Sequence, residues 1–227
     1  MARVTAGSLL VIVLMFCSHV SMDRGLASLY ANPGTSTLSL WREGKRLPQH
    51  SDWEKTRASL EKALSYDRQN PDLLHKLGEA YDAEVAYHAV GDAAAANMRT
   101  TAREEYLKAL GERPTWPYDW MALALVEYRL NQVDAEFYRA LHRSVALGPW
   151  EPSVKYRVAE IGLHHWNHLD NDVRGFVTGI IRHAAANRDT ATDMLKLLRR
   201  YDMLDMVCND NVADESIGQY CKPYHHP

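Results

Sequence analysis

The stretch YLKALGERPTWPYDW, residues 106–120, decides the fold because the chain contains two further versions of it. The segments that start at Leu60 and Leu141 align with it without gaps. The equivalent small residues are Ala63, Ala109 and Ser144, and the equivalent prolines are Pro71, Pro117 and Pro152. The copies are 46 and 35 residues apart, and the second step is close to the ~34 residues of a tetratricopeptide repeat. The sequence therefore predicts a repeat built from helix pairs.

A second helix is expected after each proline, because a proline pushes the residue before it out of helical geometry and suits the start of a helix. In the first copy this helix carries Leu77, Gly78 and Tyr81, and in the second it carries Trp120, Leu123 and Ala124. These residues match the tetratricopeptide consensus W-x-x-L-G-x-x-Y, which combines a large residue, a small one and an aromatic wedge. The third copy departs from this consensus, as a terminal unit is expected to do.

The first step exceeds the repeat length by about a dozen residues. Residues 91–98 contain four consecutive alanines and are the obvious place for the insertion. Because alanine favours helix, we expect the extra residues to lengthen the two flanking helices. Beyond the third copy, residues 173–186 and 190–201 have helical periodicity and are expected to cap the array.

The predicted fold is all-α, a tetratricopeptide-like α-solenoid of helical hairpins behind one N-terminal transmembrane helix. No run of alternating β-branched residues is long enough to predict a sheet. We assign residues 1–22 to an anchor or signal, 23–50 to a juxtamembrane helix and linker, 51–208 to the repeat domain and 209–227 to a C-terminal tail.

The N-terminal segment has no formally charged side chain from residue 4 to residue 22. At ~1.5 Å per residue, such a helix just reaches across the ~30 Å hydrocarbon core of a bilayer. A cleaved secretory signal is the alternative, but the sites for cleavage between small residues are poor, so an uncleaved anchor is favoured. Arg3 adds a positive charge before the segment, whereas the charges of Asp23 and Arg24 offset each other after it. Because the more positive side faces the cytoplasm, we expect the N-terminus inside and the body outside the cytoplasm.

Composition and motifs exclude several classes of function. The formal charge is −3 with both signs interleaved, so no basic face for nucleic acid is present. The sequence has no Gly-rich phosphate loop, nucleophile elbow or zinc-protease helix, so an enzyme built on familiar motifs is excluded, and we expect neither catalytic residues nor a cofactor. The neighbouring acids Glu104 and Glu105, and Asp170 and Asp172, fit solvated helix faces better than a glycan-cleaving pair.

The pattern His164-His165-x-x-His168 comes closest to a metal site. On a helix, His164 and His168 would share one face at a spacing that can chelate a metal. A third ligand at a diagnostic spacing is missing from the sequence, so we predict no metal site and keep these two histidines as weak candidates.

Cys208 and Cys221 are the only cysteines in the folded part, because Cys17 lies in the apolar segment. In an oxidising compartment the two could close a short loop, and two free thiols are an equally open alternative.

Six tryptophans and twelve tyrosines are more rings than a small helical array needs. Trp116, Tyr118 and Trp150 are candidates for a surface that binds a partner protein or a glycan, since sugar rings stack on aromatic faces. Packing between helices is the alternative for each ring, and Trp53 and Trp120 occupy positions where repeats pack.

Three stretches carry a family resemblance: RPTWPYDW at residues 113–120, DAEFYRAL at 134–141 and LGPWEP at 147–152. Supporting positions are Trp41, Asn70-Pro71-Asp72, Gly162-Leu163, Trp166, Leu169-Asp170 and residues 204–208. Together they resemble the VpsP family of bacterial exopolysaccharide-biosynthesis proteins over most of the chain. The resemblance implies a membrane-associated accessory protein that works with machinery for making and exporting a polysaccharide, and it brings no catalytic residues.

We therefore expect a scaffold at the bacterial inner membrane, with its body in the periplasm. Its expected partners are other proteins of an exopolysaccharide assembly or export machinery, with polysaccharide as a further candidate ligand. The alternative from another class is a periplasmic glycan-binding module that uses exposed aromatics. A metal-dependent or glycan-cleaving enzyme is the third and least favoured alternative.

Overall fold

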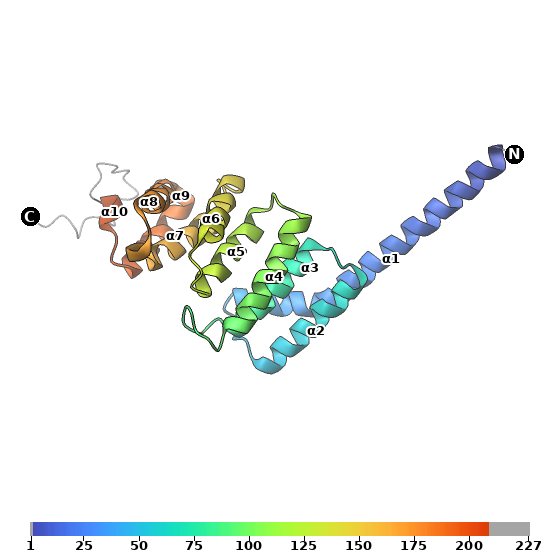
Figure 1. The fold of residues 1–227 in the computed structure, drawn as a ribbon, viewed down its shortest axis with the longest axis horizontal. Helices are drawn as coiled ribbons and strands as arrows, with labels where there is room; N and C mark the ends of the chain where they lie inside the picture. Colours follow the sequence, from blue (N-terminus) through green and yellow to red (C-terminus); the bar gives the residue numbers. More distant parts are fainter. Residues whose placement is uncertain (1, 209–227) are drawn as a thin grey trace, which may run out of the picture. The chain divides into compact units, whose positions relative to one another are not determined.

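The computed structural model describes residues 2–208, and it contains helices but no strand within that range (Figure 1). The elements in chain order are α1 (Ala2–Arg42), α2 (His50–Tyr66), α3 (Pro71–Glu84), α4 (Ala96–Glu112), α5 (Pro117–Arg129), α6 (Ala135–Leu147), α7 (Pro152–His164), the 3₁₀ turn η1 (Trp166–His168), α8 (Asn171–Ala185), α9 (Arg188–Arg200) and α10 (Asp205–Cys208). The described residues pack as two compact units. Unit 1 comprises residues 2–114 with Arg129–Asn131, and unit 2 comprises Thr115–Tyr128 with residues 132–208.

The three sequence repeats correspond to the helix pairs α2–α3, α4–α5 and α6–α7. Pro71, Pro117 and Pro152 are the first residues of α3, α5 and α7, where a helix needs no donor from its N–H group. The small residues Ala63, Ala109 and Ser144 are all 0% exposed in the first helix of each pair. The prediction of an all-α fold of tetratricopeptide-like helix pairs behind an apolar N-terminal helix is therefore confirmed.

Glycines in two of the second helices allow a neighbouring helix to come close: Gly78 at the small position of the consensus, and Gly162 at the position of its aromatic residue. A Cβ atom on Gly78 would lie 2.7 Å from Cε1 of Tyr106, and one on Gly162 would lie 2.6 Å from Cγ1 of Val177. In real structures a Cβ never comes this close to its neighbours. α3 therefore packs on α4, and α7 on α8, through positions that only glycine can fill.

α1 is one continuous helix that crosses the boundary expected at residue 22. Pro33 lies inside it and cannot supply a backbone donor. Ser59 of α2 repairs the interrupted ladder, because its hydroxyl donates to the carbonyl of Tyr30 at 2.5 Å and accepts from the N–H of Gly34 at 3.2 Å. A Cβ on Gly34 would lie 3.0 Å from the carbonyl oxygen of Thr56, so glycine allows α2 to come this near.

The second half of α1 belongs to the core of unit 1. Ala27, Leu38 and Trp41 are buried together with Trp53 and Leu60 of α2. The segment expected to be a juxtamembrane helix and linker therefore provides one of the packed helices of unit 1. The first half projects away from α2 and α3 (Figure 1), with its apolar side chains exposed from Val11 to Phe16.

The expected lengthening of helices around the insertion is wrong. α3 ends at Glu84 and α4 begins at Ala96, and the residues between them form turns. Gly91 has a φ of +73° and donates its N–H to the carbonyl of Arg129 at 2.9 Å. Such a φ favours glycine and ends helical geometry, which outweighs the helix propensity of the alanines.

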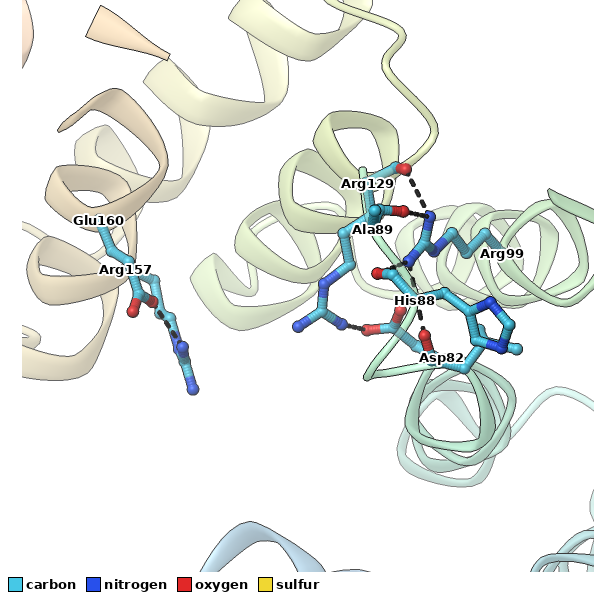
Figure 2. A network of polar contacts seen from close by, with 8 residues as sticks. Asp82, His88, Ala89, Arg99, Arg129, Arg157 and Glu160 are labelled. Atoms are coloured by element: carbon cyan, nitrogen blue, oxygen red, sulfur yellow. Dashed lines mark hydrogen bonds and ion pairs between the residues drawn. The ribbon is translucent and has the colours of Figure 1, made fainter. Parts of the chain in front are cut away.

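Arg99 of α4 holds this turn segment in place (Figure 2). Its side chain is 1% exposed, and its two terminal nitrogens donate to the carbonyls of residues 85, 88, 89 and 129, three of them at 2.8 Å and that of Val85 at 3.4 Å. Burial lowers the pKa of Arg99, and the nearby carboxylate of Asp82 opposes that shift. Asp82 also forms an ion pair with Arg129.

The capping helices expected after the third repeat are present as α8 and α9. Asp170 and Asn187 cap them, since their side chains accept from backbone N–H groups of the first turns at 2.8 and 2.9 Å. Both helices contribute to a core cluster that includes Val177, Ile181 and Leu198.

Candidate functional site

Two proline-containing turns of unit 2 meet at the start of α5. The turn before α7 contains Gly148, and a Cβ there would lie 2.9 Å from Cβ of Pro117. The missing side chain lets the residues that follow Gly148 lie against the first turn of α5. The turns that carry Trp116 and Trp150 are thereby brought to one end of unit 2.

Aromatic side chains gather where these turns meet. The ring centroids of Trp116 and Tyr118 are 5.6 Å apart and the rings are tilted by 48°, which is a favourable aromatic arrangement. The hydroxyl of Tyr118 donates to the carboxylate of Glu151. That hydrogen bond, followed by partial burial, raises the pKa of Tyr118, so this hydroxyl stays a donor at neutral pH. The pair fixes a carboxylate beside the rings.

The two tryptophans of this group are exposed. Trp116 is 45% and Trp150 is 73% exposed, whereas Trp41 and Trp53 are buried and Trp120 is half-buried beneath the guanidinium of Arg143. We call the group formed by Trp116, Tyr118, Trp150 and Glu151 the aromatic cluster. Large exposed rings beside an oriented acceptor can stack on an apolar ring face and bind a donor at the same time.

The two weak candidate metal ligands do not lie on one helix. His164 is the last residue of α7 and His168 the last of η1, so the shared helix face assumed for them does not exist. Among the described residues, no group of three or more His, Cys, Asp or Glu side chains is placed to hold a metal ion. The helix ends here because His165 adopts non-helical geometry at its C-cap.

The histidines pack on an aromatic side chain instead. The rings of His164 and His165 meet Tyr128 edge-on, at 5.5 and 5.2 Å between ring centroids. Burial, and then the neighbouring His168 and His164, lower the pKa of His165. The arrangement is that of histidines packed against a neighbouring helix.

The neighbouring acids have structural contacts. Glu105 is buried and its carboxylate accepts from the ammonium of Lys108 at 2.6 Å. Asp170 caps α8. Cys208 is buried in α10, and Cys221 lies outside the described residues, so their pairing stays a prediction.

Sequence reasoning missed two residues of the aromatic cluster region. Glu151 was read as part of a turn, and Gly148 was not connected to Pro117. The motif Gly-Pro-Trp-Glu-Pro at residues 148–152 is the signal that could have found both, since a glycine before two prolines marks a close approach.

Comparisons with known proteins add little to this picture. No protein-family model matches the chain, and no curated protein matches it. One solved structure that matches is described as "Functional Characterization of Pseudomonas Aeruginosa pilF"; it is 15% identical, the match covers 89% of this chain and 93% of that one, and the TM-score is 0.35. A TM-score that low carries no argument, so the fold rests on the helices and contacts described above.

Proposed function

We propose that the chain is a membrane-anchored, tetratricopeptide-like scaffold of bacterial exopolysaccharide biosynthesis and export, which acts by protein–protein interaction. The observation that carries the proposal is the aromatic cluster, which is exposed on a framework of buried helix pairs. Exposed tryptophan and tyrosine side chains are enriched where proteins bind one another, because they supply large contact areas at low entropic cost.

The anchor in this proposal is the first half of α1. Among the described residues, one helix, Val11–Arg42, is long and apolar enough to cross a membrane by length and composition. We assign the first half of α1 to the bacterial inner membrane as an uncleaved span, with the body in the periplasm. In support, the second half of the same helix is packed into unit 1, so cleavage near residue 22 would cut within a continuous helix.

The polysaccharide role is supported by the resemblance to the VpsP family. Two of the three stretches that carry the resemblance, residues 113–120 and 147–152, also build the aromatic cluster. The resemblance and the exposed surface therefore point to the same part of the chain.

Deleting the gene tests this proposal. Secreted polysaccharide should fall while the pools of sugar-nucleotide precursors stay at their normal level, because a scaffold acts on assembly and not on precursor synthesis. Normal secretion in the deletion strain would refute the role.

A second candidate function is direct glycan binding by the aromatic cluster. The exposed faces of Trp116 and Trp150 favour it, since a sugar ring stacks on an indole while the Glu151 carboxylate accepts from its hydroxyl groups. Titrating the purified protein with oligosaccharide fragments, with tryptophan fluorescence as the signal, distinguishes the two functions. A saturable change that is lost in Trp150→Ala supports glycan binding, and no change leaves protein partners.

A further inference from the structure

A groove of about 560 Å³, lined by both apolar and polar side chains, lies between α1 and the start of α3 in unit 1. Its walls include Gly25, Ser28 and Asn32 of α1, and Asn70, Asp72 and Lys76 at the start of α3. A second hollow of about 530 Å³, bounded by Arg24, Asp67 and Glu112, shares Asn70 and Asp72 with it. The two hollows adjoin at these shared residues, and we call them together the α1–α3 groove.

Positively and negatively charged side chains line this groove, and most of them form no ion pair with one another among the described residues. Within the described part of the chain, neither Arg24 nor Lys76 forms an ion pair, although Lys76 is half-buried. Asp67 accepts from the amide of Asn70 at 3.0 Å, which leaves its negative charge in place.

The second acid without an ion pair is Glu112, whose carboxylate accepts from the neutral amide of Gln69 at 3.2 Å. Asp72 differs, because Arg113 lies 2.6 Å from its carboxylate oxygen. The groove therefore offers two cations and two anions that form no ion pair among the described residues. Lys76 and Asp67 are half-buried, whereas Arg24 and Glu112 are exposed, and a half-buried charge favours a charged partner.

The position of the groove along α1 indicates where its ligand lies. At ~1.5 Å per residue, Gly25 and Ser28 follow the apolar segment that ends at Met22 by about 5 and 9 Å. The headgroup layer of a bilayer adds roughly 5–7 Å beyond each side of the hydrocarbon core. With the first half of α1 in the membrane, the near end of the groove lies at the depth of the lipid headgroups.

We propose that the α1–α3 groove binds the headgroup of a phospholipid that carries both a phosphate and a primary ammonium, of the phosphatidylethanolamine type. Arg24 and Lys76 contact the phosphate, and Asp67 and Glu112 contact the ammonium. A purely anionic headgroup would satisfy the cations and leave the two carboxylates unpaired. The inference rests on the membrane anchoring proposed above.

The test uses the full chain in nanodiscs made from equal amounts of phosphatidylethanolamine, phosphatidylcholine and phosphatidylglycerol. Native mass spectrometry after release measures which lipid the protein retains. We expect phosphatidylethanolamine to exceed each of the other lipids by at least about threefold, the effect of one or two partly exposed charge pairs. Lys76→Gln combined with Glu112→Gln should remove the preference. Lys55→Gln, at an exposed lysine of α2, should leave it unchanged.

The outcomes separate this inference from the proposed anchor. A chain that enters the nanodiscs and retains the three lipids equally overturns the headgroup site and leaves the anchor standing. A chain that does not enter nanodiscs overturns both. Displacement of the retained lipid by soluble glycerophosphoethanolamine at an equal concentration would identify a soluble ligand and overturn the assignment to a lipid.

Discussion

Arg99 is the residue on which the turn segment after α3 depends most directly. Its guanidinium donates hydrogen bonds to four backbone carbonyl oxygens, those of residues 85, 88, 89 and 129. Its Nε atom is buried and has no hydrogen-bond partner among the described residues, so only the two terminal nitrogens of the guanidinium form hydrogen bonds there. The carbonyls of residues 85, 89 and 129 also accept a backbone N–H group, so the loss of Arg99 bears most on the carbonyl of His88. A buried carbonyl that loses its donor costs about 1–3 kcal/mol.

Replacing Arg99 with methionine should therefore lower the free energy of unfolding by about 3 kcal/mol, since methionine fills the space but donates no hydrogen bond. Urea unfolding followed by circular dichroism measures the change. Lys55→Met is the matched control: Lys55 is exposed, and its replacement should change stability by less than about 0.5 kcal/mol. Equal stability of the two variants would show that the four contacts contribute nothing.

His165 provides a pH-dependent prediction at the same scale. Its pKa is lowered by burial and by His168 and His164, so the folded protein favours the neutral ring. The neutral His165 ring makes its full contribution to the free energy of unfolding above the unfolded pKa of about 6.5. This contribution is lost as the pH falls through the lower pKa of the folded state. An NMR titration should find His165 below 6.5, and His168→Gln should raise its pKa. A value of 6.5 or above would contradict the packing of this ring against Tyr128.

At the scale of elements, the close contacts between helices depend on the positions of particular glycines. Gly162 lies against Val177, whereas Gly179 in α8 has no atom within 4 Å of its Cβ position. Both are helix-interior glycines in unit 2, so the sequence alone does not distinguish them. The consensus predicted a small residue at Gly78, whereas Gly162 stands where the consensus has its aromatic residue, so its close contact with Val177 follows from the structure alone.

Gly162→Ala should destabilise the protein by about 1–3 kcal/mol, because Val177 must move to make room. Gly179→Ala should instead stabilise it by about 0.5–1 kcal/mol through helix propensity, as nothing opposes the added methyl group. Thermal unfolding of the two variants beside the wild type gives both signs. The packing of α7 on α8 would be wrong if Gly162→Ala were as stable as Gly179→Ala.

Other elements depended on contacts between distant residues, which no local pattern reveals. α1 continues past Pro33, and the hydroxyl of Ser59, 25 residues from Gly34, bridges Tyr30 and Gly34 of the helix there. The alanines of residues 93–96 predicted longer helices, but the positive φ of Gly91 ends helical geometry there, and Arg99 holds the resulting turn segment. Local propensity located the repeats and their prolines correctly, since those positions are set within each helix pair.

At the scale of the whole molecule, the proposed location in the periplasm predicts a disulfide bond between Cys208 and Cys221. A loop of about 15 residues closed in this way stabilises the folded state by roughly 3 kcal/mol in the chain-entropy model. Peptide mapping of the denatured protein under non-reducing conditions should find the two cysteines linked and Cys17 alkylated. Alkylation of all three thiols would contradict both the bond and an oxidising location.

The sequence could predict which aromatic residues form the candidate site, but it could not predict the contacts that bring them together. Trp116, Tyr118 and Trp150 stand beside prolines, and a residue next to a turn is often exposed. Their gathering depends on the approach of Gly148 to Pro117, and the oriented carboxylate depends on the contact between Tyr118 and Glu151. These are tertiary contacts over more than 30 residues of sequence, which composition and spacing do not encode.

The most direct test of the central claim is complementation of the deletion strain with a full-length chain that carries Trp116→Ala and Trp150→Ala. Both side chains are exposed, so the variant should fold and reach the membrane in normal amounts, as a blot of the membrane fraction would verify. Tyr87→Ala is the matched control, because Tyr87 is also 73% exposed but lies in unit 1. We predict that the control restores secreted polysaccharide and that the double variant leaves it near the level of the deletion strain. Full restoration by the double variant would contradict the claim that this protein works through its aromatic cluster.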